Sequence, residues 1–109
     1  MPTIALGVPE ESEDRLAREA TRNGYDVVAR CRSAAELATA ILGTLPNVVA
    51  VAAAERYLDA DLLAQCDAAG VRIVAFAASE RERRRATAMG LHEVAVGEPD
   101  WPVLESLLG

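Results

Sequence analysis

The chain has 109 residues, of which 51% are hydrophobic and only four are aromatic, and its formal net charge is −6. The negative charge excludes a general nucleic-acid binder, because phosphate contacts need a basic face. All eleven basic residues are arginine, which excludes a P-loop and Schiff-base chemistry, since both need a lysine. No apolar run reaches the ~18 residues that span a bilayer, so we expect a cytoplasmic protein without direct membrane insertion.

Strand and helix signals alternate five times along the chain. In chain order, short apolar runs predict strands over residues 3–8, 26–31, 46–54, 71–78 and 92–96. Apolar residues at helical spacing predict helices over residues 10–23, 34–45, 57–69, 80–89 and 101–109. Residue types that begin or end helices support these limits, namely Ser33, Ser79 and Asp100 as N-caps and Gly24, Gly70 and Gly90 as stops. In the second helix, Ser33 and Glu36 have the spacing of a capping box, and the apolar stripe is formed by Leu37, Ile41 and Leu45.

The most informative segment is the apolar run over residues 46–54. A strand without polar alternation is buried on both faces, which is typical of the centre of a parallel sheet. With right-handed crossovers, the alternation predicts an α/β fold, a three-layer (βα)5 sandwich with a parallel sheet. The order 2-1-3-4-5 puts the two most apolar strands, the third and the fourth, in the interior.

Three segments carry a resemblance to response-regulator receiver domains. Residues 46–51, Pro-Asn-Val-Val-Ala-Val, resemble the receivers' Pro-Asp-Val-Val-Leu-Leu, and residues 70–75 resemble their fourth strand. Residues 88–93 resemble the segment before their fifth strand. The resemblance covers the whole chain and implies a receiver/flavodoxin-like fold.

The positions that carry receiver chemistry are changed in this sequence. By the resemblance, the phosphorylated aspartate falls at Ala52, or at Ala53 if the register slips, the serine or threonine at Ala77, and the lysine near Gly97. Phosphoryl transfer to a carboxylate needs a nucleophile, a metal ion and a cation for the moving oxygens. We therefore expect a pseudo-receiver with no catalytic residue, metal or cofactor, which is not an enzyme and is not switched by phosphorylation.

A closer resemblance is to the degenerate receiver-like N-terminal domains of actinobacterial TadZ/CpaE or septum-site-determining-like MinD/ParA family proteins. It rests on residues 30–37, on Tyr57-Leu58 and on the arginine-rich fourth helix. It implies that residues 1–109 are one pseudo-receiver domain at the start of a longer protein. Its role would be dimerisation, recruitment or localisation of an attached ATPase at pilus (secretion) machinery or the septum.

The densest charge in the chain is the run over residues 81–85, which begins the fourth helix. It is a solvated helix face, a partner surface, or a contact for a nucleotide or cyclic dinucleotide, since arginine favours bidentate contacts with phosphate. On the second interpretation, Arg83 and Arg84 pair with Glu93 and Glu98 of a second copy, as in receiver dimers. Trp101 either covers the sheet edge or anchors an interface with a neighbouring domain. The predicted interaction face is accordingly Arg81, Arg83, Arg84, Glu93 and Trp101.

Two other functions stay open at this point. Small residues at the strand ends, Val8, Ala52, Ala53 and Ala77, leave room for a small molecule or a cyclic dinucleotide. Alternatively, the chain is the receiver-like domain of an atypical transcription regulator.

The remaining candidate residues have structural explanations. The acidic residues of the first helix complement its dipole. His92 has no ligand or catalytic partner nearby in sequence. Cys31 and Cys66 lack motif spacing and are expected to be reduced core thiols.

Overall fold

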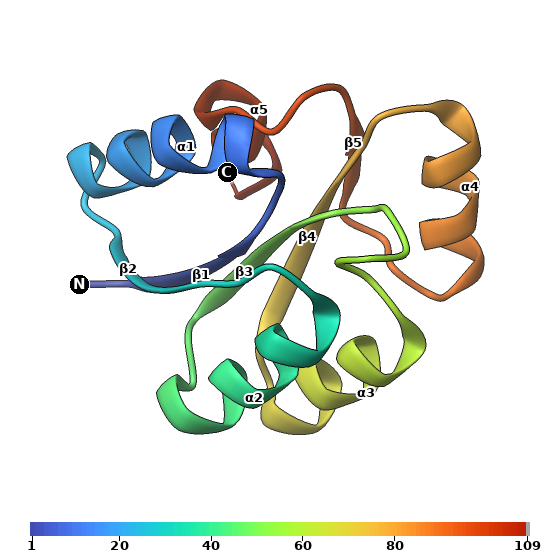
Figure 1. The fold of residues 1–109 in the computed structure, drawn as a ribbon, viewed down its shortest axis with the longest axis horizontal. Helices are drawn as coiled ribbons and strands as arrows, with labels where there is room; N and C mark the ends of the chain where they lie inside the picture. The colour runs from blue at the N-terminus through green and yellow to red at the C-terminus, as the bar shows by residue number, and fades with distance from the viewer. Residues whose placement is uncertain (109) are drawn as a thin grey trace.

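The computed structural model describes residues 1–108, which form five strands and five helices in strict alternation (Figure 1). The strands are β1 (Thr3–Gly7), β2 (Asp26–Arg30), β3 (Val48–Ala52), β4 (Arg72–Ala77) and β5 (Val94–Val96). The helices are α1 (Glu10–Arg22), α2 (Ala34–Thr44), α3 (Ala60–Ala69), α4 (Glu80–Ala88) and α5 (Trp101–Leu108). None of these helices is long and apolar enough to cross a membrane.

The five strands form one parallel sheet in the order β2-β1-β3-β4-β5, as the sequence predicts. All five residues of β3 are buried, because β1 and β4 flank it in the sheet and helices cover both of its faces. The apolar run that follows Asn47 is therefore the central strand, and the carboxyl ends of β1, β3 and β4 lie at one edge of the sheet.

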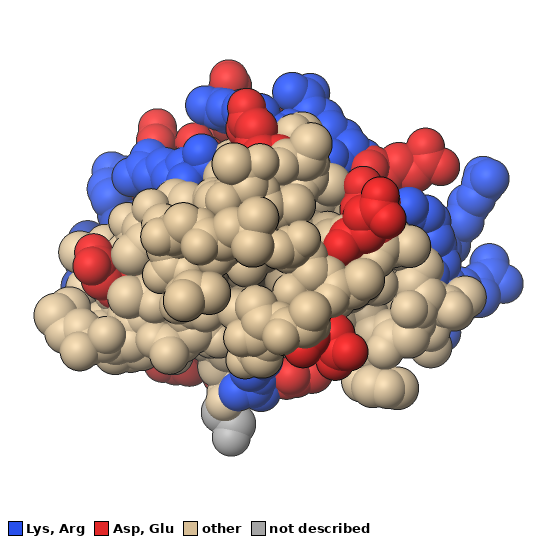
Figure 2. Space-filling model, turned by 90° about the horizontal axis from the view of Figure 1, so that it is seen from below, with Lys and Arg blue, Asp and Glu red and all other residues tan. Residues whose placement is uncertain are grey.

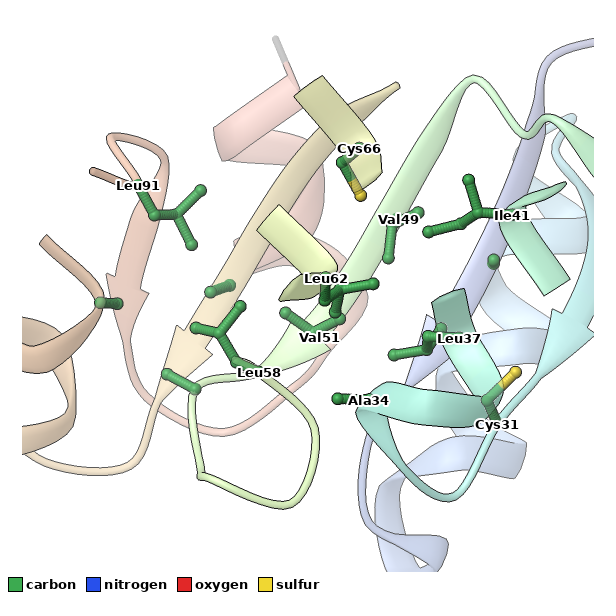
Figure 3. Packing of buried hydrophobic residues seen from close by; sticks show 14 of the residues in the cluster. Cys31, Ala34, Leu37, Ile41, Val49, Val51, Leu58, Leu62, Cys66 and Leu91 are labelled. Carbon is green, nitrogen blue, oxygen red and sulfur yellow. The ribbon is translucent and has the colours of Figure 1, made fainter. Parts of the chain in front are cut away.

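The helices cover the two faces of the sheet in unequal numbers. One core cluster joins the sheet to α1 and α5, and it contains Leu16, Phe76, Trp101 and Leu104. The other joins the sheet to α2, α3 and α4. Figure 3 shows this second core, where Leu37 and Ile41 of α2 and Leu62 and Cys66 of α3 point at β3. Apolar burial on both faces makes this a three-layer α/β sandwich.

One close approach in the second core depends on glycine. A Cβ atom added to Gly7 of β1 would lie 2.4 Å from Cδ1 of Leu37, a side chain that is fully buried. The absence of a side chain at this position lets α2 pack directly on β1.

Two helices begin with the same reciprocal cap. The hydroxyl of Ser33 accepts a hydrogen bond from the Glu36 N–H at 3.2 Å, and the Glu36 carboxylate accepts one from the Arg32 N–H at 2.6 Å. The capping predicted from Ser33 and Glu36 is confirmed, with the difference that Glu36 accepts from the residue before the N-cap and not from the N-cap itself. Ser79 and Glu82 repeat the pattern at the start of α4.

Some predicted boundaries were wrong. Helix α3 begins at Ala60 rather than at residue 57, because Asp59 accepts a hydrogen bond from the Leu62 N–H at 2.8 Å and acts as its N-cap. Tyr57 and Leu58 lie in the turn before it, and both are buried. Strand β5 begins at Val94, so His92 precedes it and is exposed.

Leu45 was wrongly placed in the apolar stripe of α2. It lies at the C-cap with a φ of 44°, a left-handed conformation that favours glycine, and its side chain points to solvent. The chain must turn sharply there because Pro46 cannot continue the helix.

Candidate functional site

A pocket of about 670 Å³ lies at the carboxyl edge of the sheet, where open α/β sheets place their ligands. Twelve residues line it, from the ends of β3 and β4, the three connections that follow β1, β3 and β4, the helices α1 and α4, and the segment after β5: Pro9, Glu11, Ser12, Arg15, Ala52, Ala54, Phe76, Ala78, Glu82, Gly97, Glu98 and Pro99.

The structure divides the four positions predicted as a degenerate phosphorylation site into two pairs. Ala52 and Gly97 line the pocket. Ala53 and Ala77 are completely buried and belong to the core beneath α2, α3 and α4. Val8 is also fully buried, on the opposite side of the sheet, and does not line the pocket. The cavity is therefore formed by fewer of the small residues than the sequence predicts.

Backbone N–H groups at this edge already have acceptors within the protein. The N–H of Ala53 donates to the carbonyl of Phe76 at 2.9 Å, and that of Gly97 donates to the carbonyl of Ala77 at 2.8 Å. The N–H of Ala78, the first residue after β4, donates to a carboxylate oxygen of Glu82 at 2.9 Å. An anion arriving at the ends of β3 and β4 would have to displace these bonds.

The carboxylates near the edge do not form a metal site. In the described part of the chain, no three His, Cys, Asp or Glu side chains are placed to hold a metal ion. The guanidinium nitrogens of Arg32 lie 2.9 Å from a carboxylate oxygen of Glu10 and 3.5 Å from one of Glu13. The Glu13 side chain is only 6% exposed. Glu10 and Glu13 are ion-paired with a neighbouring loop, in addition to any effect on the helix dipole.

Two arginines that the sequence analysis did not single out position the loop after β3. Arg56 donates from Nε to the carbonyl of Arg32 at 2.7 Å. Arg85 reaches across from α4 and donates to the carbonyls of Ala53 and Leu58, at 3.3 and 3.0 Å. In sequence Arg85 is the last of a charged run, and its residue type does not distinguish it from the other arginines of that run.

The predicted interaction face is largely occupied by contacts within the chain. Arg83 pairs with Glu80 one turn earlier on α4. Glu93 accepts a hydrogen bond at 2.8 Å from Arg72, whose second guanidinium nitrogen bonds its other carboxylate oxygen. The hydrogen bond from Arg72 lowers the pKa of Glu93. Of the five residues, Arg81 and Arg84 remain exposed and have no ion-pair partner among residues 1–108.

Trp101 is not a surface anchor. It is 7% exposed and belongs to the core between α5 and the sheet. Its ring packs edge-to-face on Tyr25, with ring centroids 5.6 Å apart and planes at 63°. Of the two interpretations that the sequence left open, the structure supports the one in which Trp101 covers the sheet.

Both cysteines are buried and free, as expected. Burial raises the pKa of the Cys66 thiol to about 11, and burial also raises that of Cys31, with smaller contributions from Glu36 and Glu13. Neither thiol has the depressed pKa of a reactive cysteine.

Comparison with known proteins places the fold among receiver domains. No family model and no curated protein matches the chain. Among solved structures, it is similar to the signal receiver domain of the response regulator NarL from Mycobacterium tuberculosis, with a TM-score of 0.78 and 16% identity over 98% of this chain and 93% of that one. The receiver domain of a modulated diguanylate cyclase from Desulfovibrio desulfuricans G20 has a TM-score of 0.73 and 15% identity, over 99% and 90% of the two chains. A LuxR-family DNA-binding response regulator from Staphylococcus aureus has a TM-score of 0.70 and 10% identity, over 99% and 94%.

The chain is thus a receiver-like domain in its fold. The strand order, the helix-covered sheet and the full-length match to receiver domains agree on this class. The identities are too low to carry a function from any of these proteins to this chain.

Proposed function

We propose that this chain is a non-catalytic receiver-like domain that works by binding other proteins and does not respond to phosphorylation. The observation that carries the proposal is the chemistry at the carboxyl edge of the sheet. Ala52 lies at the end of β3, where the receiver resemblance expects the phosphorylated aspartate, and Glu82 already accepts from the Ala78 N–H. A phosphoryl group would find no nucleophile, and it would compete with a carboxylate for that amide.

The test is exposure of the chain to acetyl phosphate and Mg²⁺, with mass spectrometry and two-dimensional amide NMR as readouts. We expect no added phosphate and unchanged spectra. An active receiver domain treated in parallel provides the positive control. Stable phosphorylation of any residue at the edge of the sheet would overturn the proposal.

We further propose that the domain is joined to a MinD/ParA-like ATPase and serves to dimerise or localise it. The resemblance of residues 30–37 and 57–58 to TadZ/CpaE-type domains supports this finer assignment. The free guanidinium groups of Arg81 and Arg84 are the part of the predicted dimer face that intramolecular pairs leave available. They can meet carboxylates of a second copy as exposed, salt-sensitive pairs.

Analytical ultracentrifugation tests the dimer. We expect self-association of the chain that weakens in an Arg81→Glu/Arg84→Glu variant and at high salt. Arg18→Glu/Arg22→Glu on α1 replaces two exposed arginines elsewhere, with the same change in charge, and provides the matched control. A chain that stays monomeric at high concentration would reject the dimer while leaving the phosphorylation result intact.

A small-molecule sensor is the second candidate, and the 670 Å³ pocket favours it because its size falls within the range of ligand sites. Three carboxylates and one arginine line the pocket, so its charge favours a neutral or cationic molecule over a cyclic dinucleotide. Thermal-shift measurements with adenosine, spermidine and cyclic di-GMP separate these possibilities. A rise in melting temperature with adenosine or spermidine, but not with cyclic di-GMP, would support a small-molecule sensor.

A further inference from the structure

Helix α3 has a second, partly exposed apolar face beside the one that packs on the sheet, and Cys66 borders both. Leu62 and Cys66 are fully buried against β3 and β4. On another side of the helix, Ala60, Leu63, Ala64 and Asp67 follow one another at spacings of three and four residues and line a groove together. Such spacing defines one face of a helix over two turns.

The groove exists because α3 and α4 diverge over the edge of the sheet. Figure 1 shows α4 standing apart from α3, beside β5. The groove lies between α3 and the segment that joins α4 to β5, and it has a volume of about 420 Å³. Its floor is formed by Val71 and Ile73 at the start of β4, and its far wall by Met89, Gly90 and Leu91 after α4. Leu63, Ile73 and Met89 are only partly buried, so apolar surface is exposed along the length of the groove.

The one charge that lines the groove is negative. Asp67 is the only charged residue that lines it, and Asp61 lies on the same helix. Neither carboxylate has an ion-pair partner among the described residues. No basic residue occurs in α2 or α3. Figure 2, which views the molecule from the side of these helices, shows a broad uncharged face with charged side chains at its rim.

We infer that this groove binds an amphipathic helix of a partner protein whose polar face is basic. The inference rests on the proposed role as an interaction domain and names the surface and the chemistry of its partner. Apolar side chains of the partner, at helical spacing, fill the space between α3 and Met89, and Ala60 and Ala64 let its backbone approach closely. Its lysines or arginines reach Asp67 and Asp61, and these pairs orient the helix.

A second copy of this chain does not meet these requirements. Helix α4 is basic but its exposed side chains, such as Arg81 and Arg84, are not apolar. Helix α5 is apolar, but it buries Trp101 and Leu104 against its own sheet. Helix α2 exposes Leu42 without any basic residue. Within residues 1–108, no helix combines an exposed apolar face with positive charge.

The probe for this surface is a fluorescein-labelled helical peptide of about 18 residues, which is ~27 Å long. It carries leucine at positions i, i+3/i+4 and i+7 on one face and lysine on the other. A peptide with glutamate in place of lysine tests the charge, and one with the same composition but scattered leucines tests the apolar face. Fluorescence anisotropy measures binding of each to the chain.

We expect only the lysine peptide with the intact leucine face to bind. Ala64→Arg, at an exposed helical position that tolerates a long side chain, should weaken binding by about tenfold or more by filling the groove. Asp67→Arg should weaken binding of the lysine peptide and strengthen binding of the glutamate peptide. Ala35→Arg, an exposed alanine on α2 outside the groove, adds the same charge and should reduce affinity about twofold at most. Circular dichroism confirms that each variant is folded.

Two results would overturn the inference: no saturable binding of the lysine peptide, or equal losses from Ala64→Arg and Ala35→Arg. The titration is repeated with acetyl phosphate and Mg²⁺. A change in the affinity for the lysine peptide on phosphorylation would overturn the proposed function but leave the groove as its binding site. Failure of the proposed function is therefore distinguishable from failure of the groove assignment.

Discussion

The carboxylate of Glu82 accepts a hydrogen bond at 2.9 Å from the backbone N–H of Ala78, the residue that directly follows β4. The same glutamate donates its own N–H to the Ser79 hydroxyl at 3.2 Å, so one residue closes the N-terminus of α4 and the end of the strand. The acceptor at this amide is therefore part of the fold, and no external anion is needed there.

Replacing Glu82 should destabilise the domain. In Glu82→Ala the Ala78 N–H loses its acceptor, and we expect a loss of about 1 kcal/mol in the free energy of unfolding by urea. Glu98→Ala removes another carboxylate from the same pocket, one with no hydrogen bond in the described structure, and should change stability by less than about 0.5 kcal/mol. Equal losses of stability in Glu82→Ala and Glu98→Ala would indicate that negative charge at the edge of the sheet, and not the helix cap, stabilises the domain.

Gly7 and Gly43 should respond in opposite directions to alanine. Gly7→Ala places a Cβ against the buried Leu37, and overpacking of this kind costs about 1–3 kcal/mol. Gly43 lies within α2, where an added Cβ meets nothing within 4 Å, so Gly43→Ala should stabilise by about 0.5–1 kcal/mol. Thermal unfolding of both variants measures the effects. A neutral Gly7→Ala would show that Leu37 can move without cost.

Leu45→Gly should stabilise the protein although it removes a large apolar side chain. Leu45 is 63% exposed and holds a φ of 44°, so little packing is lost and a left-handed strain of about 1 kcal/mol is relieved. Leu42 is equally exposed but lies in the body of α2, where Leu42→Gly should cost about 1 kcal/mol. Urea unfolding compares the two. A loss of stability in both would show that the Leu45 side chain makes a contribution that outweighs its backbone strain.

The pair of Arg72 and Glu93 should make a small, pH-dependent contribution to stability. The hydrogen bond from Arg72 lowers the pKa of Glu93 from 4.5, so the contribution is complete above pH 4.5 and disappears as the pH falls through the lower folded-state value. Because both side chains are more than a third exposed, we expect about 0.5 kcal/mol after solvent screening.

Glu93→Gln tests this contribution. Its stability deficit against the unmodified chain should be present at pH 7 and absent at about pH 3, as measured by urea unfolding at both pH values. A deficit that does not change with pH would mean that the shape of the side chain, and not its charge, is responsible.

The sequence predicts most of this fold because its local signals agree. The apolar strands, the Ser33 cap and the glycine stops each limit one element, and together they define the alternation that the sheet requires. The errors fall where tertiary contacts decide. Tyr57 and Leu58 look helical in sequence, but both are buried in a turn before the helix. The guanidinium group of Arg85 donates a hydrogen bond to the carbonyl of Leu58 in that turn.

The candidate site could be predicted only in part. The uncharged residues Ala52 and Gly97, at positions where the receiver resemblance expects an aspartate and a lysine, are visible in the sequence. The pairing of Arg83 with Glu80 and of Glu93 with Arg72, and the burial of Trp101, depend on which side chains meet in space. The spacing of Leu58, Leu62, Leu63 and Cys66 in the sequence indicates one apolar face of α3, but it could not show that Leu58 precedes the helix or that Leu63 lines a partly exposed groove with Ala64.

The outer strands of the sheet limit how the domain can associate. Strand β5 has only three residues, and β2 begins and ends with charged residues, Asp26 and Arg30. Short or charged outer strands are poor templates for hydrogen bonding to a strand from another chain. Continuation of the sheet into a partner, and the ordered aggregation that follows from it, are therefore disfavoured. Association must use side chains on the helices, where specificity is set by shape and charge.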